Sequence, residues 1–211
     1  GGDAINTACM CMQSGKADIM LAVGAESVLC PLVIYSLANA KALSRRNDSP
    51  STASRPFDVT RDGFVIGEGG GALVLETEEH ALARGAKIYA EIRGCGNTDD
   101  AYHVTAPHPE GRGAIACMKQ AIAEAGINPS DIGYINAHGT ATNKGDTVEA
   151  SSIKKVFGNT LPYVSSTKGA TGHMMGAGGI TETITCVKAI ETGTVPPTIN
   201  LNEVDPECAG I

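Results

Sequence analysis

The hydrophobic pattern alternates short apolar runs with longer amphipathic stretches. Apolar runs predict strands at 19–23, 64–66, 72–75, 87–94, 132–135 and 161–164. Helical spacing predicts helices at 2–15, 31–43, 78–84, 111–125, 143–157 and 176–192. Because continuous apolar strands alternating with helices are typical of a sheet buried on both faces, we expect an α/β fold. A rise in helix and charge density between 76 and 87 predicts a boundary near residue 80.

Two histidines follow predicted buried strands. His138 lies in the segment Asn136–Thr142, after the apolar run that ends at Ile135. His173 closes the segment Ser165–His173, after the run that ends at Val164. Each is accompanied by glycine and threonine and leads toward a helix. Open α/β sheets carry their chemistry at the carboxyl ends of strands, so both histidines are candidate functional residues.

One glycine-rich motif argues against nucleotide binding. Residues 67–72 fit the letters G-x-G-x-x-A, but the apolar run 73–75 that follows is typical of a strand. The dinucleotide fingerprint requires a helix at that position. These glycines are therefore expected to let backbones approach closely. Residues 176–179 open a predicted helix that could take an anion, although close packing beside His173 is the simpler interpretation.

Composition excludes several classes of protein. The chain has 211 residues, 42% of them hydrophobic, and a net charge of -7, which disfavours nucleic-acid binding. The sequence contains neither a run of eighteen apolar residues nor a signal-peptide pattern. The cysteines form no C-x-x-C pair, so we expect reduced packing thiols and no metal site. They are Cys9, Cys11, Cys30, Cys95, Cys117, Cys186 and Cys208.

Together these segments resemble the β-ketoacyl-acyl-carrier-protein synthases, most closely the long-chain type, from Gly1 to about Asn202. Further segments that carry the resemblance are Ala25–Glu26, Ala42–Ser44, Ser54–Asp58, Arg61–Phe64, Asp100–His103 and Val195–Asn200. The resemblance implies a thiolase-like fold with α-β-α-β-α layers, present here as an incomplete fragment. Residues 1–80 would close the N-terminal half of the synthase, and 81–211 would form a truncated C-terminal half.

The resemblance implies a decarboxylative Claisen condensation of malonyl-acyl-carrier-protein with an acyl-enzyme thioester, in fatty-acid elongation. His138 and His173 would donate hydrogen bonds to the thioester enolate, a stabilisation by preorganised dipoles. The family's nucleophilic cysteine would lie three residues before Gly1, so the chain is expected to be about half of a subunit. By itself it is expected to be inactive and to fold poorly.

The resemblance also assigns supporting residues. Lys168 would act electrostatically, paired with Glu182, with an ordinary surface lysine as the alternative. Thr140, Thr142 and Thr105 would bind the pantetheine arm of the carrier, with local turn capping as the alternative.

Three cations and one apolar residue complete the set. Lys41 would dock the acidic carrier protein, together with Arg45 and Arg46, although a solvated helix end is an open alternative. Leu37 stands where the long-chain type usually has phenylalanine, which puts the acyl chain length in doubt. Arg61 and Asp62 are expected to form an ion pair, and His103 and His108 to be structural.

The implied enzyme needs no resident cofactor, because its substrates are carried on the phosphopantetheine of acyl carrier protein. A homodimer is expected, in the cytoplasm or an organelle matrix, without nucleic acid, membrane or metal. Three alternatives stay open. They are a polyketide ketosynthase, a non-catalytic partner subunit resembling a chain-length factor, and a thiolase, which would not need this pair of histidines.

Overall fold

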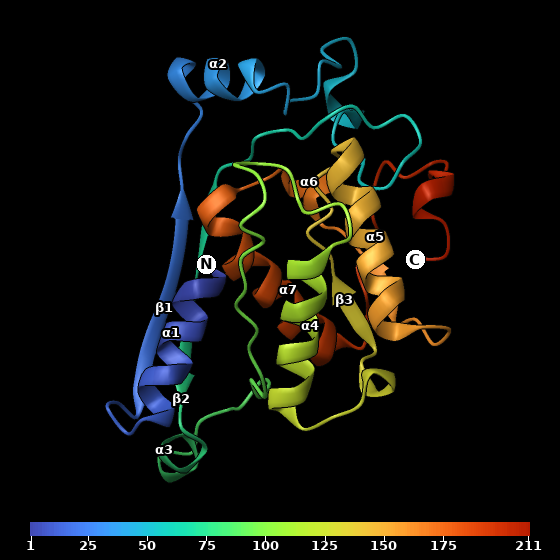
Figure 1. Cartoon of the computed structure of the whole chain (residues 1–211). Coiled ribbons are helices and arrows are strands. Elements are labelled where there is room, and N and C mark those ends of the chain that lie inside the picture. Colours follow the sequence, from blue (N-terminus) through green and yellow to red (C-terminus); the bar gives the residue numbers. More distant parts are fainter. The chain divides into compact units, whose positions relative to one another are not determined.

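The computed structural model describes residues 1–211 and divides them into two compact units that interleave along the chain (Figure 1). Unit 1 comprises Gly1–Val28, Gly67–Ile92 and Met174–Thr194. Unit 2 comprises Leu29–Ile66, Arg93–His173 and Val195–Ile211. The predicted boundary at residue 80 concerns the sequence halves of the resembled family and stays a prediction.

Unit 1 is built on an antiparallel pair of strands, β1 (Ile19–Glu26) and β2 (Gly69–Glu76). The register runs from Ile19 opposite Glu76 to Glu26 opposite Gly69. The unit's helices are α1 (Gly2–Gln13), α3 (Glu78–Ala83), the 3-10 turn η3 (Met175–Ala177) and α7 (Gly178–Thr192). Helices α1 and α7 pack on the strand pair and enclose a core of Ile5, Ala22 and Ile180. The strand and helix predictions for this unit are thus largely confirmed, including the strand that follows the glycine motif.

One face of β1 contradicts the expectation of a sheet covered on both sides. Side chains of a strand alternate between its two faces. Ala22 and Gly24 are buried, whereas Ile19, Leu21 and Val23 are 49%, 63% and 51% exposed. An apolar run indicates that both faces of a strand favour burial. It does not show that other segments of the same chain pack on both faces.

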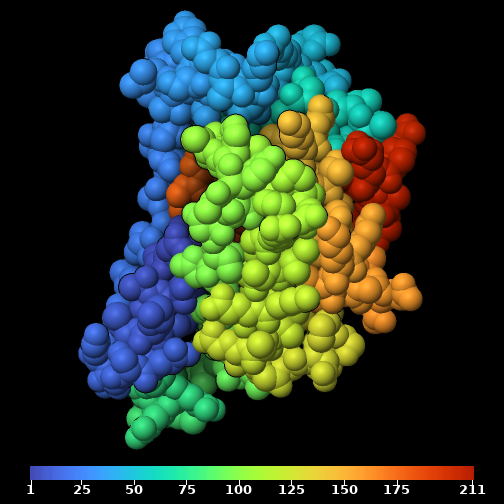
Figure 2. Space-filling model, viewed as in Figure 1, coloured from blue at the N-terminus to red at the C-terminus, as the bar shows by residue number.

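Unit 2 contains a parallel pair of strands, β3 (Tyr134–Asn136) and β4 (Tyr163–Ser165). Its α-helices are α2 (Pro31–Asn39), α4 (Arg112–Ala125), α5 (Asn143–Phe157) and α6 (Lys168–Thr171). Three 3-10 turns are η1 (Pro50–Thr52), η2 (Pro129–Asp131) and η4 (Pro206–Cys208). Helices α4 and α5 pack together, and their surfaces adjoin in the space-filling view (Figure 2). Buried Phe57, Ala137, Ala150 and Cys208 form the core.

Two predicted strands are wrong. Residues 87–94 form no strand, and 64–66 make only isolated bridges, Phe64 with Leu43 and Ile66 with His173. Apolar runs without a continuous neighbour cannot form a ladder, and the hydrophobic pattern does not identify neighbours. The strands that form make two separate pairs, β1 with β2 and β3 with β4. Cys30 is exposed, which contradicts its expected packing role.

Helix α2 ends at Asn39, earlier than the predicted residue 43, and none of its residues is buried. Its atoms lie in plain view at the top of Figure 2. Lys41, just beyond it, has φ +55°, a left-handed conformation that glycine usually adopts. None of the chain's helices combines the length and the apolar character needed to cross a lipid bilayer.

Candidate active site

The first histidine lies on a turn between β3 and α5. The strand ends at Asn136, and the helix begins at Asn143. Gly139 has φ +31°, and a Cβ atom there would lie 2.6 Å from Ser166 Cβ and 3.0 Å from the ring of Phe57. Glycine is therefore required at this position both by conformation and by space.

Two charged side chains bind the backbone of this turn. The Glu149 carboxylate accepts hydrogen bonds from the backbone N–H groups of His138 and Gly139, both at 2.7 Å. Lys168 Nζ donates to the His138 carbonyl at 2.6 Å, and Lys168 is only 2% exposed. Such charge-assisted bonds are stronger than neutral ones. The alternative of an ordinary surface lysine at 168 is thereby excluded.

The second histidine follows the short helix α6. Gly172 turns the chain with φ +67°, and the His173 N–H then donates to the Val65 carbonyl at 2.7 Å. The ring of Phe64 meets the His173 ring edge-on, with centroids 5.2 Å apart. Segment 64–66, predicted as a strand, therefore serves as a brace for His173.

The two imidazoles lie side by side. Their ring centroids are 5.2 Å apart and the ring planes are inclined at 88°. Although His138 is an exposed residue, desolvation of its ring, then the charge of Lys168 and then His173 lower its pKa to about 3. Desolvation, followed by the Lys168 charge, lowers the pKa of His173 to about 4. Both rings are therefore neutral at pH 7 and carry N–H donors.

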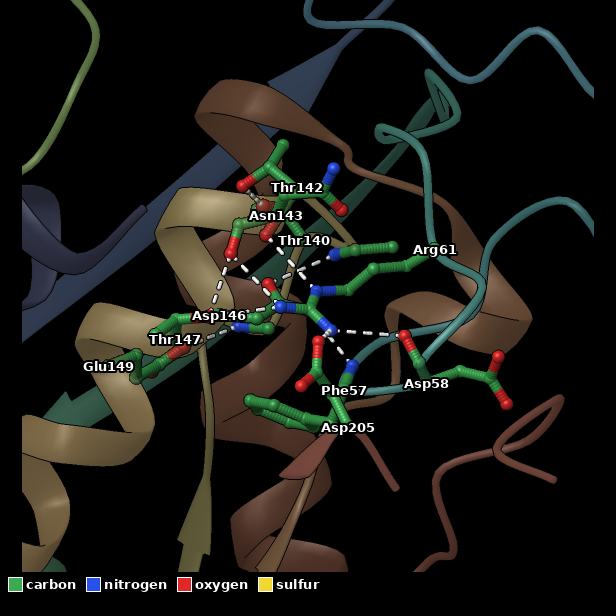
Figure 3. Close-up of polar contacts among 12 residues, drawn as sticks. Phe57, Asp58, Arg61, Thr140, Thr142, Asn143, Asp146, Thr147, Glu149 and Asp205 are labelled. Carbon is green, nitrogen blue, oxygen red and sulfur yellow. Dashed lines mark hydrogen bonds and ion pairs between the residues drawn. The ribbon is translucent and has the colours of Figure 1, made fainter. Parts of the chain in front are cut away.

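A buried arginine connects the loop 54–63 with the start of α5 and the C-terminal segment (Figure 3). Arg61 Nη1 pairs with Asp205 at 2.6 Å, and its Nε lies 3.6 Å from Asp146. The same guanidinium donates to the carbonyl groups of Asp58 and Asn143, both at 3.0 Å. This network fixes the beginning of α5 beside the His138 turn.

The predicted Arg61–Asp62 pair is wrong. Asp62 instead accepts hydrogen bonds from Ser44 Oγ at 2.6 Å and from the Arg45 N–H at 3.1 Å. Adjacent residues of opposite charge suggest a pair in sequence, but successive side chains of this turn point to different neighbours. The partners of Arg61 lie 85 and 144 positions farther along the chain.

Two carboxylates of α5 were missed by the sequence analysis. Asp146 is buried and accepts hydrogen bonds from the N–H groups of Phe57 at 2.8 Å and Ala141 at 3.1 Å. Glu149 lies one helical turn farther on. Their i, i+3 spacing on a helix that opens just after the His138 motif was the available signal, because it places both on one face.

The predicted threonines divide between two places. The Thr140 and Thr142 hydroxyls are 3.0 Å apart and share a hydrogen bond beside His138. Thr105 lies on the exposed segment 101–105, where its N–H donates to His103 Nδ1 at 3.1 Å. The Thr140 and Thr142 hydroxyls thus bond locally, as the alternative interpretation expects, whereas the Thr105 bond uses only its backbone N–H.

The remaining predicted residues lie apart from the histidine pair or in the other unit. Glu182 belongs to α7 in unit 1, so its pairing with Lys168 stays a prediction. Leu37 is partly buried on α2. Lys41 and Arg45 are exposed, whereas Arg46 is partly buried and donates to the Thr60 carbonyl at 2.8 Å.

Known proteins share this architecture. The sequence matches the family "Beta-ketoacyl synthase, N-terminal domain" over residues 1–81 and "Beta-ketoacyl synthase, C-terminal domain" over 89–202. The 3-oxoacyl-[acyl-carrier-protein] synthase 2 of Synechocystis sp. is 50% identical over 99% of this chain and 50% of its own length. The mitochondrial 3-oxoacyl-[acyl-carrier-protein] synthase of Arabidopsis thaliana is 49% identical over 98% of this chain and 46% of its own length.

Solved structures of ketosynthases also match this chain. A type II polyketide ketosynthase in complex with its acyl carrier protein matches with a TM-score of 0.95 and 42% identity, over 99% of this chain and 52% of that one. A beta-ketoacyl synthase from Burkholderia phymatum matches with a TM-score of 0.93 and 42% identity, over 99% and 50%. The chain thus spans about half the length of the relatives it matches. It has the thiolase-like α/β fold of these ketosynthases, and it belongs to the beta-ketoacyl synthase family.

Proposed function

We propose that the protein carrying this chain condenses malonyl-acyl-carrier-protein with an acyl-enzyme thioester to give a β-ketoacyl-carrier-protein in fatty-acid elongation. The single observation that carries the proposal is the pair of neutral imidazoles, His138 and His173, 5.2 Å apart. The names of relatives about 50% identical support it. No resident cofactor is needed, because the pantetheine belongs to the carrier.

The proposed chemistry depends on the negative charge that develops on the thioester oxygen. The bond between the malonyl α-carbon and its carboxylate breaks, CO₂ leaves, and the electron pair enters the thioester as an enolate. Two neutral N–H donors stabilise this oxyanion, and one such donor contributes on the order of 3 kcal/mol. The enolate carbon then attacks the acyl thioester carbon and expels the enzyme thiolate. We assign that thiol to the cysteine expected three residues before Gly1.

Supporting roles belong to the residues around the pair. Lys168 holds the His138 carbonyl, and after desolvation its charge is the next largest cause of the low pKa values of both imidazoles. We propose that Thr140 and Thr142 exchange their mutual hydrogen bond for bonds to the pantetheine arm, with Thr105 contacting the same arm.

The test of the reaction uses the full-length protein with malonyl-acyl-carrier-protein and an acyl donor. CO₂ release and β-ketoacyl product should fall about 100- to 1,000-fold in His138→Ala and in His173→Ala. His80→Ala, which changes a surface histidine of unit 1, is the matched control. A wild-type protein that releases no CO₂, or histidine variants with full activity, would contradict the proposal.

Polyketide synthesis is the second candidate, because the 0.95 TM-score match is a polyketide ketosynthase. The reaction is the same, but the unreduced product is extended again. Supplying only malonyl-carrier and a primer distinguishes the two, since a polyketide enzyme accumulates poly-β-keto chains whereas an elongation enzyme stops after one condensation.

We propose that acyl carrier protein docks on Lys41 and Arg45, which are exposed, with Arg46 beside them. The complex of a related ketosynthase with its carrier supports this partner. Lys41→Glu with Arg45→Glu should raise KM for the carrier substrate about tenfold. Turnover of a malonyl-pantetheine lacking the carrier should be unchanged, and an equal loss with both substrates would contradict docking here.

We propose a homodimer of the full-length protein, in the cytoplasm or, in a eukaryote, in an organelle matrix. The exposed apolar side chains Leu29, Leu32 and Tyr35 at α2 support a protein contact. Light scattering after size exclusion tests the dimer.

On the same helix, Leu37 is proposed to limit the acyl pocket. Leu37→Phe should therefore shift the preferred acyl length, measured with a series of acyl-carrier substrates.

A further inference from the structure

Every backbone polar group of His138 and Gly139 is bound by a side chain. Glu149 accepts both N–H groups, and Lys168 donates to the His138 carbonyl. The fourth group, the Gly139 carbonyl, accepts a 2.7 Å hydrogen bond from Ser166 Oγ. Ser166 is the uncharged member of this set, and the proposed reaction assigns it no chemical step.

Ser166 belongs to the segment that carries the second histidine. It follows β4 directly and precedes α6, the helix that leads to His173. Its N–H donates to Thr198 Oγ1 at 3.0 Å, and its Oγ accepts a bond from the Lys168 N–H at 3.3 Å. One hydroxyl therefore joins the segment of the second histidine to the turn of the first.

Packing enforces the same connection. Ser166 is 0% exposed, and its Cβ occupies the space where a side chain at residue 139 would begin, 2.6 Å from an ideal Cβ position. The Gly139 carbonyl is sealed from water at this contact, so it has no solvent to replace a lost donor. Leaving a buried carbonyl unpaired costs about 1–3 kcal/mol, which a turn can relieve by moving.

We propose that Ser166 is a positioning residue that fixes the His138 turn against the segment of Lys168 and His173, and so sets the spacing of the two imidazoles. The inference rests on the proposed function of that pair. Ser166 does not touch the reacting atoms in this scheme. It acts through the Gly139 carbonyl, one peptide away from the imidazole that binds the enolate.

The chain provides a matched control at Ser152. This serine is also 0% exposed, and its hydroxyl also donates to a backbone carbonyl, Val148, at 2.7 Å. Ser152→Ala thus removes a side-chain-to-carbonyl bond of equal length from the middle of α5 instead of from the histidine turn. Comparing Ser166→Ala with Ser152→Ala in the full-length protein separates a loss of position from a loss of stability.

The first measurement is kinetic. In Ser166→Ala we expect kcat for malonyl decarboxylation to fall about 10- to 100-fold, with KM for the carrier substrate changed less than about threefold, since a misplacement of 1 Å costs about 100-fold. Ser152→Ala should leave kcat unchanged, because the Val148 carbonyl keeps its helical N–H partner. Ser166→Cys, whose thiol is a weak donor, should recover part of the rate. Equal kcat values in the two alanine variants would overturn the proposal.

The second measurement needs no activity. Proteins with ¹³C-labelled histidine are titrated by NMR, and we expect the His138 signal of Ser166→Ala to move and its midpoint to shift, because the ring changes its position relative to Lys168 and His173. Ser152→Ala should reproduce the wild-type titration. An unchanged His138 titration in Ser166→Ala would overturn the positioning role. A wild-type protein without decarboxylase activity would refute the proposed function but not the positioning role of Ser166. The NMR titration tests that role without any activity.

Discussion

At the scale of single residues, burial moves the ionisable groups around the histidine pair in opposite directions. It lowers the pKa values of His138 and His173 to about 3 and about 4. Burial raises the pKa values of Asp146 and Glu149 to about 6, against the lowering effect of the hydrogen bonds they accept. In every case desolvation is the largest cause and favours the neutral form. The site therefore combines neutral donors with carboxylates that hold them in place.

Glu149 gives a pH-dependent prediction. Its pKa is raised from 4.5 to about 6, so between these values the folded protein keeps a proton that the unfolded chain has released. Its contribution to the free energy of unfolding is fully present well below pH 4.5 and is lost as pH rises past 6, a total of about 2 kcal/mol. Glu149→Gln removes that dependence, so the stability of wild type relative to the variant should fall by about 1 kcal/mol between pH 4.5 and 6.

Urea unfolding of the full-length protein at both pH values measures the difference, with Glu79→Gln, on exposed α3, as the control substitution. The ¹³C-histidine titration, repeated on Glu149→Gln, measures the opposite contribution of the two histidines, which is subtracted before the slopes are compared. An unaltered pH slope in Glu149→Gln would show that this carboxyl group is ionised throughout the window.

Asp58 gives a prediction of stability. Burial alone would raise its pKa, but hydrogen bonds from Thr60, Asn202 and Glu203 outweigh it and hold the pKa far below the ordinary value of 3.8. The carboxylate also pairs with Arg55 at 3.4 Å. Asp58→Asn leaves one acceptor oxygen and an unpaired arginine, so we expect a loss of about 3–5 kcal/mol in urea unfolding at pH 7. Exposed Asp48→Asn is the control, and a loss under 1 kcal/mol would contradict this account.

At the scale of elements, helices were more predictable than strands. Helix α5 begins and ends where its spacing predicts, at Asn143 and Phe157, because a helix satisfies its backbone within one segment. A strand depends on a neighbour elsewhere in the chain. Segments 19–23 and 87–94 were both predicted as strands, yet only the first, in β1, finds a partner, β2.

In the candidate site too, local features were predictable from the sequence and long-range contacts were not. The sequence identified His138, His173 and Lys168 through local motifs. It missed Glu149 and Ser166, and it assigned Arg61 the wrong partner, because these roles depend on contacts between segments 11 to 144 positions apart. Local patterns locate the groups that carry chemistry, whereas the groups that hold them are defined only by the fold.

The segment that carries Thr105 is ordered by an imidazole. His103 Nδ1 accepts hydrogen bonds from the N–H groups of Thr105 and Ala106, both at 3.1 Å. His103→Ala removes the acceptor, so amide exchange at these two residues should accelerate about tenfold. His103→Asn offers an amide oxygen at a similar distance from the backbone and should retain the protection. Mass-spectrometric hydrogen exchange checks this, and equal rates in both variants would contradict a capping role.

At the scale of the whole molecule, the histidine pair and the residues that hold it belong to one unit. Unit 2 contains both histidines, Lys168, and the braces Glu149, Ser166 and Phe64. Unit 1 contributes a strand pair whose apolar outer face the chain leaves exposed. A face of this kind is typical of a surface that associates. The expectation that the isolated chain folds poorly depends on such surfaces, and a cooperative thermal transition of the 211-residue chain would count against it.

The exposed face of β1 predicts the behaviour of the 211-residue chain in solution. Leu21 lies at its centre, 63% exposed between Ile19 and Val23, so the chain should self-associate and bind a hydrophobic dye. Leu21→Lys places a charge on this face without altering the buried positions of the strand, and it should reduce both dye fluorescence and sedimentation coefficient. Val104→Lys, at a position 97% exposed in unit 2, is the control and should change neither. If the wild-type chain is monomeric and binds no dye, the prediction is wrong. An apolar face that drives association would produce dimers or larger species at the concentrations of the measurement.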